Sequence, residues 1–170
     1  MTQTTIGAGF VLKSDTLNPT MPLPLKYVSD GSGCNGKNVS PELEWNGAPK
    51  ETKSFAVTVF DPDAPTGKGW WHWLVVNIPP ATKALEEGAS NNHRLPKGAL
   101  EGRTDFGRSG YGGACPPKGD KPHRYVFTVY ALSVDNLDID PGSNGDEVKK
   151  NIEKNTISKA SLTVKYGRKD

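Results

Sequence analysis

Acids, aromatic residues and a histidine crowd into the stretch DPDAPTGKGWWHW at residues 61–73. Three of the four tryptophans and one of the three histidines lie there, which indicates either a lined cavity or a very aromatic core. Asp61 precedes a proline, so its backbone stays extended at the end of a strand, and Asp63 falls in the turn that follows. A carboxylate held beside His72 can orient the imidazole by accepting one ring N–H.

Each of these residues also has a purely structural interpretation. His72 is the one polar residue among otherwise apolar even positions, and a lone histidine on such a face is more often a satisfied core residue than a ligand contact. Asp61 and Asp63 can equally serve as caps of the turn. This stretch alone therefore leaves the question open.

A second stretch, GGACPPKGDKPHRY at residues 112–125, favours a ligand-binding role over the purely structural one. It places a glycine-rich loop before a strand in which His123 and Tyr125, two residues apart, share one face. Glycines allow backbone N–H groups to approach an oxyanion, and imidazole and phenol add further donors. The combination predicts a phosphate or carboxylate receptor, and the alternative is a hairpin loop rich in Gly and Pro for turn geometry alone.

The elements that must position these residues are mainly strands. Residues 54–60, 71–78 and 124–132 are apolar on both faces or rich in β-branched residues, which is typical of central strands. Weaker strands are predicted at residues 10–13, 23–27, 43–45 and 162–166. A helix is predicted at residues 145–155, because Asn144 can cap it with Glu147 three residues later. Residues 79–123 form a long glycine-rich segment with a short helical turn near residues 83–87, and residues 1–170 form a single domain.

Composition argues against several classes of function. The net charge is +2 and basic residues are scattered, so we expect no nucleic-acid partner. No apolar run approaches the roughly 20 residues of a membrane helix, and the first residues lack the pattern of a signal peptide. GSGCNG at residues 31–36 matches a dinucleotide motif literally, but no helix is predicted after it. A metal site made of Asp61, His72 and His123 is disfavoured because no paired-ligand spacing supports it, and we expect no cofactor.

The two cysteines, Cys34 and Cys115, both lie in glycine-rich loops. This arrangement fits either one disulfide or two free thiols. We expect one bridge, which would close about 81 residues and contribute roughly 4–5 kcal/mol. A disulfide favours an oxidising compartment, so we expect a periplasmic protein, or one secreted after signal removal, with the cytoplasm as the alternative.

Three motifs follow one another along the chain: DPDAP at residues 61–65, WWHWLVVNIP at residues 70–79 and PPKGDKPHRY at residues 116–125. Together they resemble the phosphatidylethanolamine-binding protein family, which includes the Raf kinase inhibitor proteins. NVSPELEW at residues 38–45 and TDFG at residues 104–107 are similar to its bacterial and archaeal branch. The resemblance implies a mainly β fold, in which a large antiparallel sheet packs on a smaller one with a few peripheral helices. It also implies a small pocket for phosphate, phosphoryl-ethanolamine or acetate.

The resemblance further implies a set of ligand-binding residues, namely Asp61, Asp63, Pro65, Trp70, His72, Gly113, His123 and Tyr125. This chain departs from the family at Cys115, where a glycine often precedes the PP pair. Eukaryotic members carry a further helix after the last strand, whereas this chain ends soon after residues 162–166, so we do not expect their membrane or kinase regulation to carry over.

The function predicted from these residues is a non-enzymatic binding module for a small anionic ligand. Bacterial relatives tend to be homodimers, so a homodimer is expected. One alternative is a protein-interaction role, as a protease or kinase inhibitor that uses the pocket rim and residues 79–123. Another is a hydrolase built on an Asp61–His72 pair, for which the sequence offers no evident nucleophile or metal.

Overall fold

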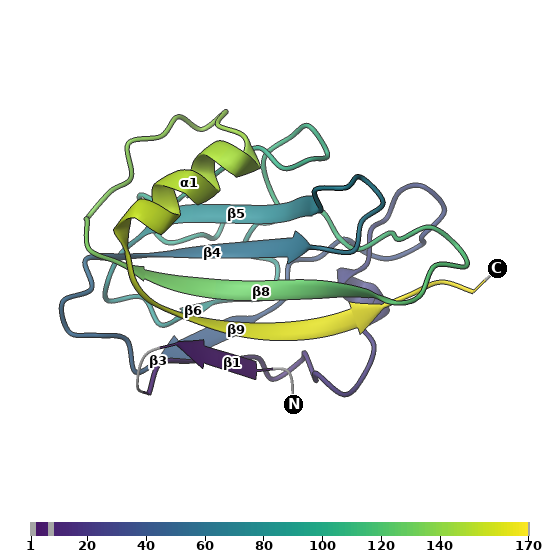
Figure 1. Cartoon of the computed structure of the whole chain (residues 1–170), viewed down its shortest axis with the longest axis horizontal. Helices are drawn as coiled ribbons and strands as arrows, with labels where there is room; N and C mark the ends of the chain where they lie inside the picture. The colour runs from purple at the N-terminus through teal and green to yellow at the C-terminus, as the bar shows by residue number, and fades with distance from the viewer. Residues whose placement is uncertain (1–2, 7–8, 170) are drawn as a thin grey trace.

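The computed structural model describes residues 3–6 and 9–169, which form two antiparallel sheets (Figure 1). The six-stranded sheet has the order β1 (Gln3–Ile6), β9 (Thr156–Tyr166), β8 (His123–Leu132), β4 (Ser54–Asp61), β5 (Trp70–Ile78) and β7 (Leu100–Glu101). The three-stranded sheet has the order β2 (Val11–Lys13), β3 (Leu43–Asn46) and β6 (Ala84–Leu85). The predicted fold class, a large sheet with a smaller one, is confirmed.

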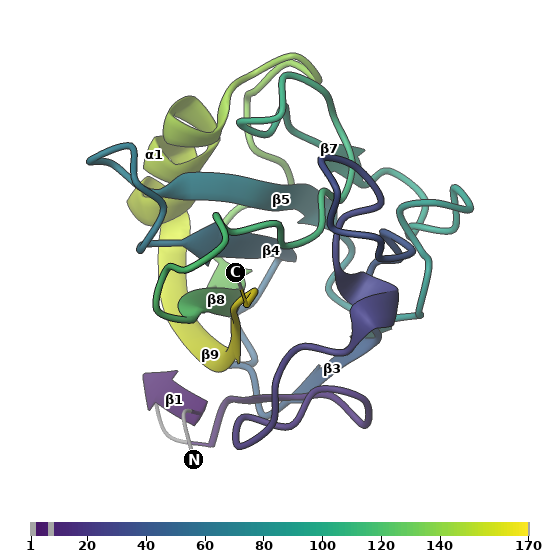
Figure 2. The same cartoon turned by 90° about the vertical axis from the view of Figure 1, so that its right-hand side faces the viewer.

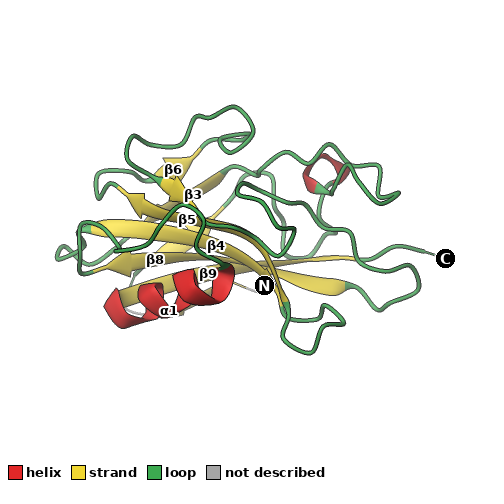
Figure 3. Ribbon diagram, turned by 90° about the horizontal axis from the view of Figure 1, so that it is seen from above, coloured by secondary structure: helices red, strands yellow, loops and turns green. Residues whose placement is uncertain are grey.

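The main core lies between the two sheets, with β3 of the small sheet on one side of the large sheet and α1 on the other (Figures 2 and 3). Val57 of β4, Trp73 of β5 and Phe127 of β8 are fully buried there against Leu12 and Leu43 of the small sheet. Burying a side chain of this size stabilises the fold by roughly 1.5–3 kcal/mol each. The central strands therefore carry much of the buried core.

The single α-helix among the described residues, α1 (Gly145–Asn155), covers the other face of the large sheet. Asn144 caps it by accepting the Glu147 N–H at 2.9 Å, as the sequence predicts. Val148 and Ile152 are fully buried against Leu74 of β5. The predicted helix is confirmed, and in the described part of the chain no helix is long and apolar enough to cross a membrane.

The predicted strands are confirmed at residues 54–60, 71–78 and 124–132, with ends that differ by one residue. The strand predicted at residues 162–166 is the final part of the longer β9, and those at residues 10–13 and 43–45 correspond to β2 and β3.

Two predictions are wrong. Residues 23–27 do not form a strand, because a 3₁₀ turn occupies Leu25–Tyr27, with the Tyr27 N–H donating to the Pro24 carbonyl at 2.9 Å. Pro24 within this segment, and Pro22 just before it, lack the N–H that a strand ladder needs. Residues 83–87 do not form a helical turn either, since Ala84–Leu85 pair with β3 as β6 and bury Leu85.

A disulfide joins Cys34 to Cys115, with 5.7 Å between their Cα atoms. The predicted bridge is therefore present. It fixes the loop before β8 against the loop around residues 29–36, and the two loops also pair through Val28 and Ala114. Two segments that are 81 residues apart in the chain are thus held together beside the candidate site.

We predict that reduction of this disulfide lowers the free energy of unfolding by about 2–5 kcal/mol, because the unfolded chain then regains the entropy that the cross-link removes. Urea unfolding with and without reductant measures the difference. The control is the double variant Cys34→Ser/Cys115→Ser, which should show the lower value in both conditions. An unfolding midpoint of the unaltered chain that ignores reductant would contradict this prediction.

Candidate ligand-binding site

Three strands of the large sheet bring the predicted site residues to one end of the molecule, at the right of Figure 1. β4 lies between β5 and β8 and runs antiparallel to both. The last residue of β4, Asp61, therefore lies beside the first residues of β5 and β8. His72 is the third residue of β5, and His123 and Tyr125 are the first and third of β8.

A β-bulge in β5 sets the direction of His72. Val59 pairs with Trp73 while the next residue, Phe60, pairs with Trp71, so His72 is the extra residue between them. Trp73 packs between the sheets whereas Trp71 packs on the α1 side, which shows that the alternation of faces reverses here. The bulge turns His72 toward Tyr125 and away from the apolar face that strict alternation predicts.

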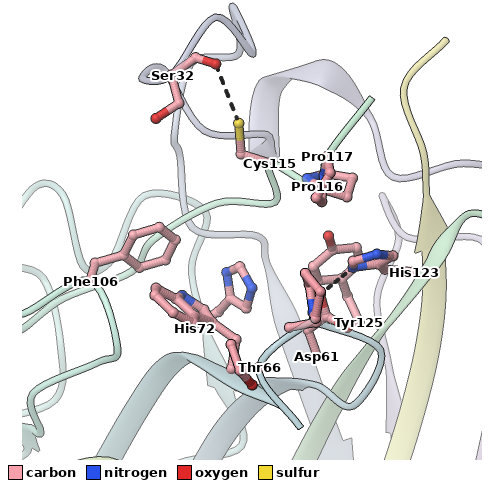
Figure 4. A pocket seen from close by; sticks show the side chains of 13 residues that line it. Ser32, Asp61, Thr66, His72, Phe106, Cys115, Pro116, Pro117, His123 and Tyr125 are labelled. Atoms are coloured by element: carbon pink, nitrogen blue, oxygen red, sulfur yellow. Dashed lines mark hydrogen bonds and ion pairs between the residues drawn. The ribbon is translucent and has the colours of Figure 1, made fainter. Parts of the chain in front are cut away.

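These residues line a cavity of about 240 Å³ (Figure 4). Its walls are mostly aromatic rings and prolines, and its lining residues are Ser32, Asp61, Ala64, Pro65, Thr66, Trp70, His72, Phe106, Cys115, Pro116, Pro117, His123 and Tyr125. Drug-sized ligands occupy pockets of about 300–1,000 Å³, so this cavity suits a smaller group. Six of the eight predicted ligand-binding residues are brought together here, and the two others, Asp63 and Gly113, are not.

The His72 ring lies between two aromatic rings at the cavity. Its centroid is 5.3 Å from that of Phe106 and 5.2 Å from that of Tyr125, both in edge-to-face contact. Nδ1 is 2.7 Å from the carbonyl oxygen of Gly112. Because a carbonyl can only accept, Nδ1 carries the proton. Nε2 makes no hydrogen bond to any described residue.

Burial favours the neutral form of the His72 ring. Desolvation lowers the pKa of His72, while the backbone of Gly112 and Gly113 and the charges of Asp61 and Asp105 act in the opposite direction. A neutral ring protonated at Nδ1 leaves a lone pair on Nε2. The cavity therefore receives a hydrogen-bond acceptor from His72.

Tyr125 supplies the complementary group, a donor. Its side chain is only 2% exposed, and its hydroxyl has no hydrogen-bond partner in the described part of the chain. Burial, followed by the charge of Asp61, raises the pKa of Tyr125, so the phenol keeps its proton. A buried polar group without a partner costs about 1–3 kcal/mol, which a bound acceptor would relieve.

His123 is held on both sides by carboxylates. Its Nδ1 is 2.7 Å from Oδ2 of Asp61, and its Nε2 is 3.0 Å from Oδ2 of Asp120. Burial disfavours the charged ring, but the two carboxylates outweigh it and raise the pKa of His123. Both ring nitrogens are already engaged, and the raised pKa favours the imidazolium, whose positive charge offsets the negative charge of Asp61.

Asp63 lies outside the cavity, in the turn after β4. Its carboxylate accepts from Arg124 Nη2 at 2.8 Å and Nε at 3.0 Å, and from the Arg124 backbone N–H at 2.8 Å. These hydrogen bonds lower the pKa of Asp63 to about 2. The Asp63 N–H donates to Asp61 Oδ1 at 2.8 Å, so Asp63 ties the turn to β8 and fixes the carboxylate of Asp61.

Gly113 does not line the cavity either, and its predicted role in ligand binding stays a prediction. Its N–H donates to Asn38 Oδ1 at 2.7 Å, which leaves no free donor. A Cβ at this position would lie 2.5 Å from the carbonyl oxygen of Tyr27. A glycine is needed here because two backbone segments approach closely.

The sequence analysis assigned no ligand role to several residues of the site, including Phe106, which forms a wall, Asp120, which holds His123, and Asn38, which fixes the loop before β8. Phe106 lies in TDFG and Asn38 in NVSPELEW. Both motifs support the resemblance to the bacterial and archaeal branch, but the sequence assigns neither residue a role in the site. Asp120 could have been found from its position three residues before His123, within reach across a turn.

A comparison with known proteins decides the family. The family model described as "Phosphatidylethanolamine-binding protein" matches residues 13–167. The chain belongs to the phosphatidylethanolamine-binding protein family. It is 49% identical to the UPF0098 protein YbcL of Escherichia coli over 94% of this chain and 88% of that protein, and 47% identical to YbhB of the same organism over 91% and 98%.

Solved structures of the family agree with the fold. The crystal structure of Escherichia coli YbcL covers 95% of this chain and 100% of its own, with a TM-score of 0.92. A homologue from Chlamydia trachomatis, 32% identical, covers 95% and 99% with a TM-score of 0.80. The predicted resemblance to the bacterial branch is thus confirmed.

We predict that the Asp61–His123–Asp120 contacts stabilise the fold below neutral pH and less above it. A histidine whose folded pKa is raised contributes its full stabilisation below the unfolded value of 6.5 and loses it as pH rises through the folded pKa. Asp120→Asn should lower the pKa of His123 and narrow the pH range of this stabilisation. NMR titration of the histidine ring protons measures the pKa, and a His123 signal that titrates below pH 6.5 in the unaltered protein would contradict the assignment.

Proposed function

We propose that this chain is a non-enzymatic binding protein for a small oxyanion group, such as phosphate, a phosphorylated headgroup or a carboxylate. The observation that carries the proposal is Tyr125, which lines the cavity and whose buried hydroxyl has no acceptor among the residues that the structure describes. A ligand oxygen that accepts from it would satisfy this group. The description of the matching family, which names phosphatidylethanolamine, supports a phosphorylated headgroup as one candidate.

The rest of the cavity supports this function through shape and charge. Trp70 and Phe106, whose ring centroids are 5.4 Å apart, form an apolar wall that excludes water from the bound group. Low polarity around the ligand strengthens each hydrogen bond that it makes. The imidazolium of His123 neutralises Asp61, so that this carboxylate does not simply repel an anion.

We also propose that the protein works in an oxidising compartment, periplasmic or extracellular, because the Cys34–Cys115 disulfide is rarely stable in a reducing cytosol. The homodimer and the protein-partner role stay predictions.

The test is a titration with O-phosphorylethanolamine, followed by the NMR signals of the three histidine rings. We expect the signals of His72 and His123 to shift at millimolar ligand. His93 is exposed and does not line the cavity, so its signal is an internal control. Unchanged signals of His72 and His123 would overturn the proposed function.

A matched variant tests the role of the Tyr125 hydroxyl by itself. Tyr125→Phe removes the hydroxyl and should weaken binding by about tenfold or more, as expected for the loss of a hydrogen bond to a charged acceptor. Its free energy of unfolding should be unchanged or higher, because the buried donor has no partner to lose. Isothermal titration and urea unfolding measure both, and an unchanged affinity would count against Tyr125 as the ligand donor.

A further inference from the structure

A second cavity lies at the opposite end of the large sheet from the candidate ligand-binding site. It has a volume of about 430 Å³ and is lined by Trp45 of β3 and Phe55 of β4, one residue from each sheet. Phe55 and Asp61 are six residues apart in β4, so at about 3.3 Å per residue the two cavities are roughly 20 Å apart. They share no lining residue, so the second cavity is a separate feature of the molecule.

The two connections between the sheets form the rest of this cavity. The connection from β3 to β4 contributes Pro49 and Lys50, and the connection from β5 to β6 contributes Pro80 and Lys83. Thr52 donates to the Pro49 carbonyl twice, from its N–H at 3.1 Å and from its Oγ1 at 2.6 Å. The turn on this side is thus closed by its own hydrogen bonds, so the wall is formed before any ligand binds.

The indole N–H of Trp45 is a buried donor without an acceptor. Trp45 is 2% exposed, and its Nε1 has no hydrogen-bond partner among the residues that the structure describes. The buried indole of Trp71 donates to Asp146 Oδ1 at 3.2 Å. That of Trp73 donates to Glu101 Oε2 at 2.7 Å. Because a buried indole usually finds an acceptor and an unpaired one is costly, a ligand oxygen that accepts from Trp45 would be stabilised.

The charge and the surface of the cavity define the rest of such a ligand. Lys50 and Lys83 are exposed at the cavity, and neither forms an ion pair in the described part of the chain. None of the described residues that line the cavity is an Asp or Glu. The rings of Trp45 and Phe55, whose centroids are 5.5 Å apart, add an aromatic surface. An anionic acceptor group on an apolar body fits both features, in a volume typical of small-molecule sites.

We propose that this second cavity binds a small aromatic carboxylate. One carboxylate oxygen accepts from Trp45 Nε1, and the aromatic body packs against Phe55. The other oxygen faces Lys50 and Lys83, which balance its charge. A carboxylate suits this arrangement because it carries a single charge on two acceptor oxygens. The proposal goes beyond the function proposed for the first cavity and does not depend on it.

The test is a titration of the ¹⁵N-labelled protein with 3-phenylpropionate at neutral pH, where the carboxylate is ionised. The indole N–H signals are followed, and Trp45→Phe assigns one of them by deleting it. We expect the Trp45 signal to move downfield at millimolar ligand, because a new hydrogen bond deshields the proton. Trp71 and Trp73 already have acceptors, so their signals are internal controls. Trp70 lines the first cavity, so its signal reports binding there.

A Trp45 signal that stays in place would overturn the proposal. If the Trp70 signal moves instead, the carboxylate occupies the first cavity, and the function proposed for that cavity is left standing. The titration is then repeated with saturating O-phosphorylethanolamine. The Trp45 shift should persist, because the two cavities share no residue. Loss of the shift would mean that both ligands compete for one site, which contradicts a second site.

Lys50→Gln/Lys83→Gln is the matched variant for the charge of the ligand. Both side chains are exposed, so the fold should be kept. Isothermal titration should show that 3-phenylpropionate binds about three- to tenfold more weakly, the effect of two exposed ion pairs. The uncharged 3-phenylpropanol has a similar body and should bind both proteins equally. An unchanged affinity for the carboxylate, or an equal loss for the two ligands, would overturn the assignment of an anion to this cavity.

Discussion

The hydrogen bond between His72 Nδ1 and the Gly112 carbonyl determines which hydrogen-bonding group His72 presents to the cavity. At 2.7 Å it fixes which ring nitrogen carries the proton, and burial lowers the pKa of the ring, which disfavours a second proton. Nε2 is thereby left as an acceptor. Without this bond the ring could reverse its tautomer, and the same side chain would present a donor.

This bond depends on the loop before β8 being held in place from several sides. Asn38 accepts the Gly113 N–H, the Cys34–Cys115 disulfide follows two residues later, and the Gly112 N–H returns to the His72 carbonyl at 2.9 Å. Near the C-terminus, Arg168 Nε donates to the Pro116 carbonyl at 2.7 Å. The segments that position one carbonyl oxygen thus come from distant parts of the chain, which suits a site that must be preorganised.

The sequence predicts the framework of the site well, because its signals are local. Runs of β-branched and aromatic residues mark β4, β5 and β8, and the Asn144 cap marks α1. The ends of antiparallel neighbours then meet, so Asp61, His72 and Tyr125 converge as expected.

The details that the sequence could not supply are those that depend on a partner segment. The bulge at His72 exists only in the register of β5 against β4, and alternation alone assigns this residue to the wrong face. A glycine such as Gly113 is compatible with an anion site and with a close backbone contact, and the contact with Tyr27 becomes visible only once the two segments are folded together. His123 likewise has the residue type of an anion donor, but Asp61 and Asp120 occupy both of its nitrogens.

The most direct test of this account is the tautomer of His72 in the free protein, read from its ¹⁵N ring resonances at neutral pH. The account predicts a neutral ring with a protonated Nδ1 and an unprotonated Nε2. A ring protonated at Nε2, or an imidazolium, would mean that the cavity offers a donor at this position, and the central claim would then be contradicted.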